Sequence, residues 1–193
     1  AGQSSLAKSY KKVKETKNSN FIGAKYFLEV LKETKSEIKF FKANSAYIFK
    51  LFKGGLRPKL KFQNPTSPYI KSQIDAFKAV KNFRKKGVNC YSLIFMNIES
   101  PLKAKSFLLN KVCDFVKYKK IRFLKLGNIY SKRDFCWAPE IMQGVFYAAN
   151  LKPQDIVFGT GKKYLVKDMI KSILQIKKID FKNFIKIDKS LYR

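Results

Sequence analysis

The stretch of sequence that decides the fold is Val88-Asn89-Cys90-Tyr91-Ser92-Leu93-Ile94-Phe95-Met96. This run is short, apolar and aromatic, and the segments on both sides of it carry apolar residues at helical spacing. A run of this length with apolar side chains at both odd and even positions is typical of a strand buried on both faces. The sequence therefore predicts a buried strand over residues 88–96 with a helix before it and a helix after it.

The alternation of helix and strand continues outward in both directions from this run. Apolar stripes and short apolar runs predict helices over residues 20–35, 70–87, 107–116, 139–150 and 166–176, and strands over residues 38–46, 121–126 and 156–158. Strands separated by helices of this length belong to an α/β fold with a largely parallel sheet. Ligands of such sheets bind beyond the carboxyl ends of the strands, which directs attention to residues 44–46, 97–101 and 127–134.

The composition combines a large positive charge with an ordinary apolar content. The 193 residues include 42 Lys and Arg, 13 Asp and Glu and no His, so the formal net charge is +29 while 46% of the residues are hydrophobic. This apolar content is enough for one core and excludes a disordered basic tail. The absence of His excludes the common imidazole bases and metal ligands, and three cysteines without a C-x-x-C pair indicate no metal site and no disulfide framework.

The positive charge predicts non-specific binding of polyanions at low salt. Only five of the basic residues are arginines, the side chains best suited to reading bases and phosphates: Arg57, Arg84, Arg122, Arg133 and Arg193. The lysines recur along the whole sequence and do not form one stripe. A basic nucleic-acid-associated protein therefore stays open as a third reading, behind the two given below.

No apolar run approaches the roughly 20 residues of a membrane span, and the sequence begins without a basic and then apolar signal arrangement. We therefore expect a soluble, cytoplasmic protein without a membrane partner. We also expect the cysteines to be reduced thiols that pack as small apolar side chains.

Several short motifs resemble those of one enzyme family in the same order. Asn97-Ile98-Glu99-Ser100-Pro101 is similar to the Asn-His-Glu-Ser-Pro segment of GDP-mannose 4,6-dehydratases, which are extended short-chain dehydrogenase/reductases. The other segments that resemble this family are Ala1-Gly2-Gln3-Ser4, Ser67-Pro68-Tyr69, Leu126-Gly127-Asn128, Lys132-Arg133-Asp134-Phe135, Gly159-Thr160-Gly161 and Tyr192-Arg193. The resemblance spans essentially the whole sequence.

The resemblance implies a Rossmann-like parallel sheet with helices on both faces and part of a small substrate-binding region. No G-x-G-x-x-G motif occurs in the 193 residues, so the Gly-rich N-terminal half of the Rossmann fold is expected to be missing. We therefore expect a single partial domain over residues 1–193, from a fragment or a degenerate member of the family. Residues 1–100 would form the C-terminal half of the Rossmann-like domain, and residues 101–193 a mixed Rossmann and substrate-binding region.

The resemblance also implies which residues take part in catalysis. In this family a Tyr with a Lys four residues later takes a sugar hydroxyl proton, a Ser or Thr hydroxyl assists it, and a Glu acts at the neighbouring carbon. Ser45 and Tyr69 match the hydroxyl and tyrosine positions, but Gln73 replaces the Lys and Tyr47 replaces the Glu. Lys71 lies about 200° around the helix from Tyr69 and cannot take the missing role. Without a cation beside it, we expect the pKa of Tyr69 to stay near about 10.

The substrate positions match the family better than the cofactor positions do. The resemblance assigns Asn97 to the sugar and phosphate region, Lys111 and Arg133 to the diphosphate, and Arg193 to the far end of the nucleotide. The cofactor implied is NADP, for which Lys103 keeps a positive charge at one of two family arginine positions. Ile98 and Leu102 depart from the family residues on that side.

These matches lead to two main hypotheses about function. The first is a GDP-mannose 4,6-dehydratase-like protein, by family a lyase of nucleotide-sugar metabolism. That family converts GDP-mannose to GDP-4-keto-6-deoxymannose through transient reduction of NADP, and this chain is expected to be impaired or inactive. The alternative is a catalytically dead Rossmann remnant that binds a nucleotide or polyanion or acts as a scaffold. The expected partner is a GDP-sugar, and a homo-oligomer stays open.

Overall fold

The computed structural model describes residues 2–50, 61–118 and 121–191, which divide into two compact units. The first unit contains Ala1–Met96 and Met142–Phe158, and the second contains Asn97–Ile141 and Gly159–Arg193. Each unit is described by itself.

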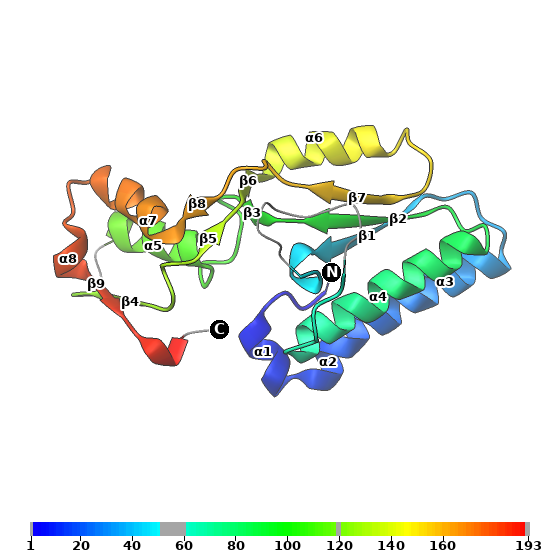
Figure 1. The fold of residues 1–193 in the computed structure, drawn as a ribbon, viewed down its shortest axis with the longest axis horizontal. Helices are drawn as coiled ribbons and strands as arrows, with labels where there is room; N and C mark the ends of the chain where they lie inside the picture. Colours follow the sequence, from blue (N-terminus) through cyan, green and yellow to red (C-terminus); the bar gives the residue numbers. More distant parts are fainter. Residues whose placement is uncertain (1, 51–60, 119–120, 192–193) are drawn as a thin grey trace. The chain divides into compact units, whose positions relative to one another are not determined.

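The first unit is built on a parallel sheet of three strands (Figure 1). Strand β2 (Cys90–Phe95) lies between β1 (Phe40–Ser45) and β7 (Asp155–Phe158), and both pairings are parallel. The first five residues of β2 are all buried, because helices cover both faces of the sheet. The strand predicted over residues 88–96 is therefore confirmed, and so is the α/β fold.

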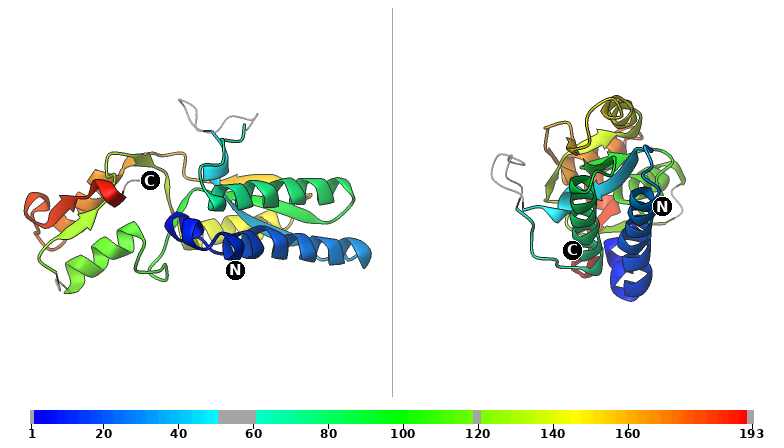
Figure 2. Two further views of the ribbon diagram at one scale, coloured as in Figure 1. Left: turned by 90° about the horizontal axis from the view of Figure 1, so that it is seen from below. Right: turned by 90° about the vertical axis from the view of Figure 1, so that its right-hand side faces the viewer.

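Helices α3 (Gly23–Glu33) and α4 (Pro68–Lys85) lie side by side on one face of this sheet, as the views of Figures 1 and 2 show. Helix α6 (Ala138–Ala148) contributes its residues from 142 onward to the opposite face. Helices α1 (Leu6–Lys11) and α2 (Val13–Lys17) and a π-helical segment (Asn18–Ile22) precede α3. Helices α3, α4 and α6 and the three strands match the predicted positions, with shifts of a few residues at the ends, whereas α1 and α2 were not predicted.

Local sequence sets the two ends of α4. The Ser67 side chain accepts a hydrogen bond from the Ile70 backbone N–H, and Pro68 occupies the first helical position, where a missing N–H costs nothing. The helix ends before Gly87, whose φ of 86° is unfavourable for residues with a Cβ. At this end, Arg84 donates to the Cys90 carbonyl oxygen at 2.8 Å and to the Asp155 carboxylate at 2.7 Å, so it ties α4 to two strands.

The described residues of the second unit form pairs of short strands and several helices. Strand β3 (Asn97–Glu99) pairs parallel with β6 (Phe135–Trp137), β4 (Leu124–Leu126) pairs parallel with β9 (Ile185–Ile187), and β5 (Lys132–Arg133) pairs antiparallel with β8 (Tyr164–Leu165). The helices are α5 (Leu108–Tyr118), α7 (Val166–Gln175) and α8 (Phe181–Phe184). One apolar core joins α5, α7, α8, β4, β6 and β9, with Val112, Phe115, Leu124, Ile129, Val166 and Ile170 among its buried members.

Two details differ from the sequence-based expectations. The strand expected over residues 121–126 is limited to Leu124–Leu126, and it pairs with β9 instead of joining the three-stranded sheet. Its alternating burial fits a short ladder covered on one face. Cys113 is exposed, so only Cys90 and Cys136 pack as buried thiols.

Within the described residues, no helix combines the length and the apolar character that a membrane crossing needs.

Gly127 allows the backbone to approach closely where β4 ends. A Cβ added at Gly127 would lie 2.5 Å from the Leu191 carbonyl oxygen and 3.0 Å from its carbon. The Asp188 N–H donates to the Leu126 carbonyl oxygen at 2.8 Å in the same region. The segment that follows β9 can therefore pack against residue 127 only because this residue has no side chain.

We expect Gly127→Ala to destabilise the second unit by about 1–3 kcal/mol, because the added methyl group meets backbone that cannot move aside cheaply. Gly23→Ala is the matched control: its Cβ would come no closer than 3.5 Å to a neighbour, and alanine favours the helix by about 0.5–1 kcal/mol. Urea unfolding, with hydrogen exchange of residues 185–191, measures both effects. Equal stability of Gly127→Ala and the native chain would contradict the packing requirement.

Candidate functional site

The first unit brings two of the predicted catalytic hydroxyls together. Ser45 is the last residue of β1, and its hydroxyl oxygen accepts a hydrogen bond from the Tyr47 N–H at 3.2 Å, which starts a 3-10 turn (Ala46–Ile48). Tyr69 lies in the first turn of α4. The side chains of Ser45 and Tyr69 are hydrogen-bonded to each other. The end of β1 and the start of α4 therefore form one hydroxyl pair.

The electrostatic environment of this pair disfavours the phenolate. Burial raises the pKa of Tyr69 above its ordinary value, and the hydrogen bond with Ser45 lowers it by less. The expected value near 10 is therefore wrong, because that expectation left out the burial of the phenol. Tyr69 therefore holds its proton more tightly than a free tyrosine does. In this neutral form its hydroxyl can donate a hydrogen bond.

The residues around Tyr69 supply no compensating positive charge at the family position. Gln73, four residues later in α4, is 5% exposed, and its Oε1 has no hydrogen-bond partner among the described residues. The Lys71 ammonium is exposed and pairs with Asp75 at 3.7 Å. This position of Lys71 agrees with the expectation that it points away from Tyr69. Tyr47 places a phenol where the resemblance implies a carboxylate.

Burial also marks polar residues on β1 and β2 that the sequence patterns did not single out. Burial lowers the pKa of Lys42 to about 8, and its ammonium donates to the Ala43 carbonyl oxygen at 2.7 Å. Asn44 and Ser92 are buried, and Asn44 Oδ1 and Ser92 Oγ have no partner among the described residues. The alternation of β1 from Phe40, which packs against buried residues of α3 and α4, is a sequence signal that could have placed Lys42 and Asn44 on the same face.

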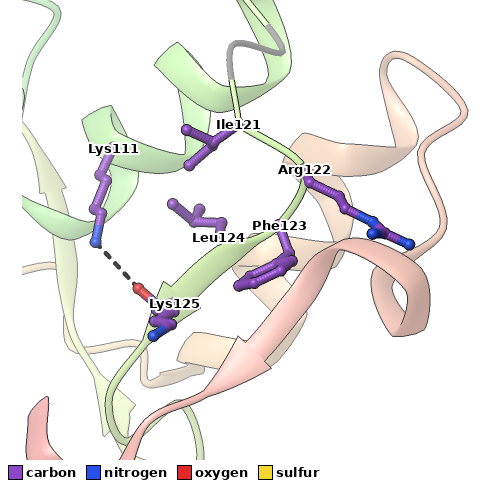
Figure 3. Close-up of a pocket in the computed structure, with 6 residues that line it drawn as sticks. All are labelled: Lys111, Ile121, Arg122, Phe123, Leu124 and Lys125. Atoms are coloured by element: carbon purple, nitrogen blue, oxygen red, sulfur yellow. Dashed lines mark hydrogen bonds between the residues drawn. The ribbon is translucent and has the colours of Figure 1, made fainter.

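The second unit contains a basic pocket of about 420 Å³ (Figure 3). Lys111 extends into it from the first turn of α5, and the Lys111 ammonium donates to the Lys125 carbonyl oxygen at 3.0 Å. The ammonium of Lys186 lies 3.8 Å from the centre of the Phe123 ring. The residues that line the pocket are Lys111, Ile121, Arg122, Phe123, Leu124 and Lys125. The wall of the pocket is mainly apolar, with Lys111 at one side, and Figure 3 shows the Arg122 guanidinium extending away from Lys111.

The other predicted substrate residues also lie in the second unit. Asn97 begins β3, and its N–H donates to the Asp134 carbonyl oxygen at 3.1 Å. Arg133 lies on β5, and its Nε is 3.4 Å from the Ser131 hydroxyl oxygen. Arg193 lies outside the described residues. Arg122, Phe123 and Lys125 were not predicted as site residues, and the one sequence signal was that Arg122 belongs to a small set of arginines.

Lys103 is engaged within its own loop. Its ammonium lies 2.8 Å from Glu99 Oε1 and 2.8 Å from the Ile98 carbonyl oxygen, and 4.7 Å from the centre of the Phe107 ring. Both charged side chains of this pair are largely buried. An ammonium with these partners is poorly placed to bind a cofactor phosphate.

The residues that the resemblance assigns to NADP therefore do not fit that cofactor. Ile98 and Leu102 have no polar side chains, and Lys103 is paired with Glu99. In the part of the chain that the structure describes, no three His, Cys, Asp or Glu side chains gather to hold a metal ion.

Comparison with known proteins places the chain among nucleotide-sugar enzymes. Residues 1–190 match the family described as GDP-mannose 4,6 dehydratase. GDP-mannose 4,6-dehydratase of Sinorhizobium fredii is 26% identical over 177 residues, which are 88% of this chain and 50% of that protein. GDP-mannose 4,6 dehydratase of Drosophila melanogaster is 29% identical over 114 residues, which are 56% of this chain and 29% of that protein. The chain thus spans about half the length, or less, of these curated relatives.

Solved structures show the same fold. UDP-glucuronic acid 4-epimerase from Bacillus cereus, in complex with UDP-glucuronic acid and NAD, matches 99% of this chain and 61% of its own, with a TM-score of 0.87 and 18% identity. RMD from Pseudomonas aeruginosa, complexed with NADPH, matches 100% of this chain and 68% of its own, with a TM-score of 0.85 and 16% identity. These likenesses establish a Rossmann-type α/β fold. Since the family match extends over nearly all of its residues, the chain belongs to the GDP-mannose 4,6-dehydratase family.

Proposed function

We propose that this chain is a GDP-mannose 4,6-dehydratase-like protein of nucleotide-sugar metabolism that binds a GDP-sugar and is impaired in dehydration. The observation that carries the proposal is the basic pocket of the second unit, because Lys111, assigned to the diphosphate by the resemblance, lines it. The relatives are named for action on GDP-mannose, and two structural neighbours were solved with UDP-sugars bound. We retain the division into a Rossmann-like half over residues 1–100 and a mixed region over residues 101–193.

The proposed binding step depends on charge and geometry in the second unit. Lys111, Arg133 and Arg193 would neutralise the diphosphate, and each guanidinium can hold two phosphate oxygens in a planar fork. Asn97 would hydrogen-bond the sugar and phosphate region. Phe123 and Leu124 offer apolar contact for a flat group beside the cations. The pocket is large enough for part of a nucleotide.

The proposed impairment concerns proton transfer in the first unit. The Ser45 and Tyr69 hydroxyls would contact the sugar hydroxyl, but a base is needed to accept its proton. Because burial raises the pKa of Tyr69, its phenolate is even scarcer at neutral pH than that of a free tyrosine. Tyr47 supplies a phenol and no carboxylate at the position of the family Glu. The residues of this chain are therefore better suited to binding and orienting a sugar than to proton transfer.

A second candidate function follows from the same observations. A catalytically inactive protein that binds a nucleotide or polyanion needs the basic pocket but not the hydroxyl pair, and the uncharged Gln73 favours it. A cytoplasmic location and a homo-oligomer belong to the first proposal as further expectations. The two candidates differ in turnover, whereas both predict binding of GDP.

The protonation state of Tyr69 tests the impairment. In chain labelled with ¹³C at the tyrosine Cζ, we expect the Tyr69 signal to titrate above pH 10, with a lower pKa in Gln73→Lys because the new ammonium lies one turn away on the same helix face. Lys71→Met is the control and should leave the titration unchanged. Conversion of GDP-mannose by the native chain would overturn the proposed impairment.

Binding of GDP tests the proposed nucleotide site. We expect Arg133→Ala or Arg193→Ala to weaken binding by about ten- to a hundredfold, since each removes charge-assisted hydrogen bonds to phosphate. Arg133→Lys should recover only part of the loss, because an ammonium cannot form the fork. Lys171→Ala, which removes an exposed charge of α7, serves as the control in calorimetry. GDP affinity unchanged by loss of both arginines would refute the proposed site.

Salt dependence separates polyanion binding from a specific nucleic-acid function. We expect binding of DNA and RNA to fall steeply between about 50 and 200 mM salt and to show no sequence preference, as lysine–phosphate contacts alone predict. Fluorescence anisotropy with two unrelated oligonucleotides measures this. A sequence preference that survives high salt would favour the nucleic-acid-associated reading instead.

A further inference from the structure

Asp134, between β5 and β6, binds a turn that is distant in the sequence. Its Oδ1 accepts hydrogen bonds from the Thr160 N–H at 3.1 Å, the Thr160 hydroxyl at 2.7 Å and the Cys136 thiol at 3.5 Å, and its Oδ2 accepts from the Gly161 N–H at 2.9 Å. All of these residues belong to the second unit. One carboxylate therefore connects residues 134–136 with the turn at residues 160–161.

The protonation states of these groups fit this arrangement. Burial is the largest single influence on Asp134 and raises its pKa, but the hydrogen bonds from Thr160, Gly161 and Cys136 together lower it below its ordinary value. Burial raises the pKa of Cys136 to about 11, so its thiol keeps the proton that it donates. At neutral pH a charged carboxylate thus accepts from four donors, and hydrogen bonds to a charged group are stronger than those between neutral groups.

The turn that Asp134 binds leads directly into the strand that pairs with Arg133. Gly161 adopts a φ of 75°, and the chain continues to β8, in which Tyr164 pairs with Arg133 and Leu165 pairs with Lys132. The backbone carbonyl oxygen of Asp134 also accepts the Asn97 N–H at 3.1 Å. Asp134 therefore fixes the backbone on both sides of Arg133 and at Asn97, two residues proposed to bind the GDP-sugar.

We propose that Asp134 is a positioning residue for Arg133 in the binding of a nucleoside diphosphate. The carboxylate holds the turn at residues 160–161, the turn sets the register of β8 against β5, and β5 presents the Arg133 guanidinium. This inference rests on the proposed function, because it assumes that Arg133 contacts the diphosphate. It adds a residue whose role is to hold another residue and not to touch the ligand.

Electrostatic repulsion alone predicts that removing the negative charge of Asp134 has the opposite effect on GDP binding from the loss of a positioning residue. A carboxylate next to a diphosphate-binding arginine repels the diphosphate, so Asp134→Asn should tighten GDP binding if only its charge matters. If Asp134 positions Arg133, the same substitution should weaken binding, because the asparagine NH₂ group cannot accept from the Gly161 N–H. The direction of the change in affinity therefore distinguishes the two roles.

The test is a double-mutant cycle on the full chain, with GDP affinity measured by calorimetry. We expect Asp134→Asn to weaken GDP binding about tenfold in the native background and to have little further effect in the Arg133→Ala background. Thr160→Val removes one donor to the carboxylate without changing any charge, and it should also weaken binding. Circular dichroism and hydrogen exchange of residues 159–165 report whether each variant is folded and whether the turn has loosened.

The results that would contradict the positioning role of Asp134 differ from those that would contradict the proposed function. If Arg133→Ala weakens GDP binding but Asp134→Asn and Thr160→Val leave it unchanged or tighten it, the positioning role is wrong and the proposed function survives. A loss on Asp134→Asn that is equally large without Arg133 would also overturn the positioning role, because it would reflect general loosening of the second unit. If the native chain does not bind GDP, the proposed function fails and the positioning role fails with it.

Discussion

The parallel pairing of β2 with β1 on one side and β7 on the other is the interaction on which the first unit depends. Because parallel strands end at the same edge of a sheet, it fixes where Ser45 leaves β1, and α4 packs back across the sheet from that edge. Ile70, Ile74 and Phe77 of α4 share a buried cluster with Ile94 of β2. The hydroxyl pair is therefore held by the core, although none of its chemistry is needed for folding.

The two units have departed from the family residues in different ways. In the first unit the geometry of the hydroxyl pair persists while the charges that would activate it are replaced, and burial then favours the neutral phenol. In the second unit Lys111, Arg133 and Arg193 keep the residue types that the resemblance implies. Of these three, Lys111 lines a pocket together with the aromatic side chain of Phe123. Binding a diphosphate needs only fixed positive charge, whereas proton transfer needs a pKa close to the working pH. Under the proposed function, Gln73 and Tyr47 in place of the family Lys and Glu would impair the chemistry, while binding of a diphosphate would remain.

Much of the fold could be predicted from the sequence, because the long elements have strong patterns. The run at residues 88–96 and the stripes of α3, α4, α5 and α7 placed these elements within a few residues. The two- and three-residue strands of the second unit could not be predicted, since pairs such as Lys132–Arg133 are too short for any periodicity. The motif matches placed Ser45 and Tyr69, and their hydrogen bond follows from the strand and helix ends that carry them. The partial burial of Tyr69 and the donors from Thr160 and Gly161 to Asp134 depend on contacts that are distant in the sequence and that no local pattern encodes.

The most direct test of the account is to titrate the ¹⁵N-labelled chain with GDP and record which backbone amide signals shift. The account predicts saturable shifts concentrated in the second unit, at Lys111, residues 121–125 and Arg133, with Tyr69 and Gln73 of α4 little changed. The absence of saturable shifts, or shifts confined to the first unit, would contradict the claim that this chain has kept a nucleotide-binding unit.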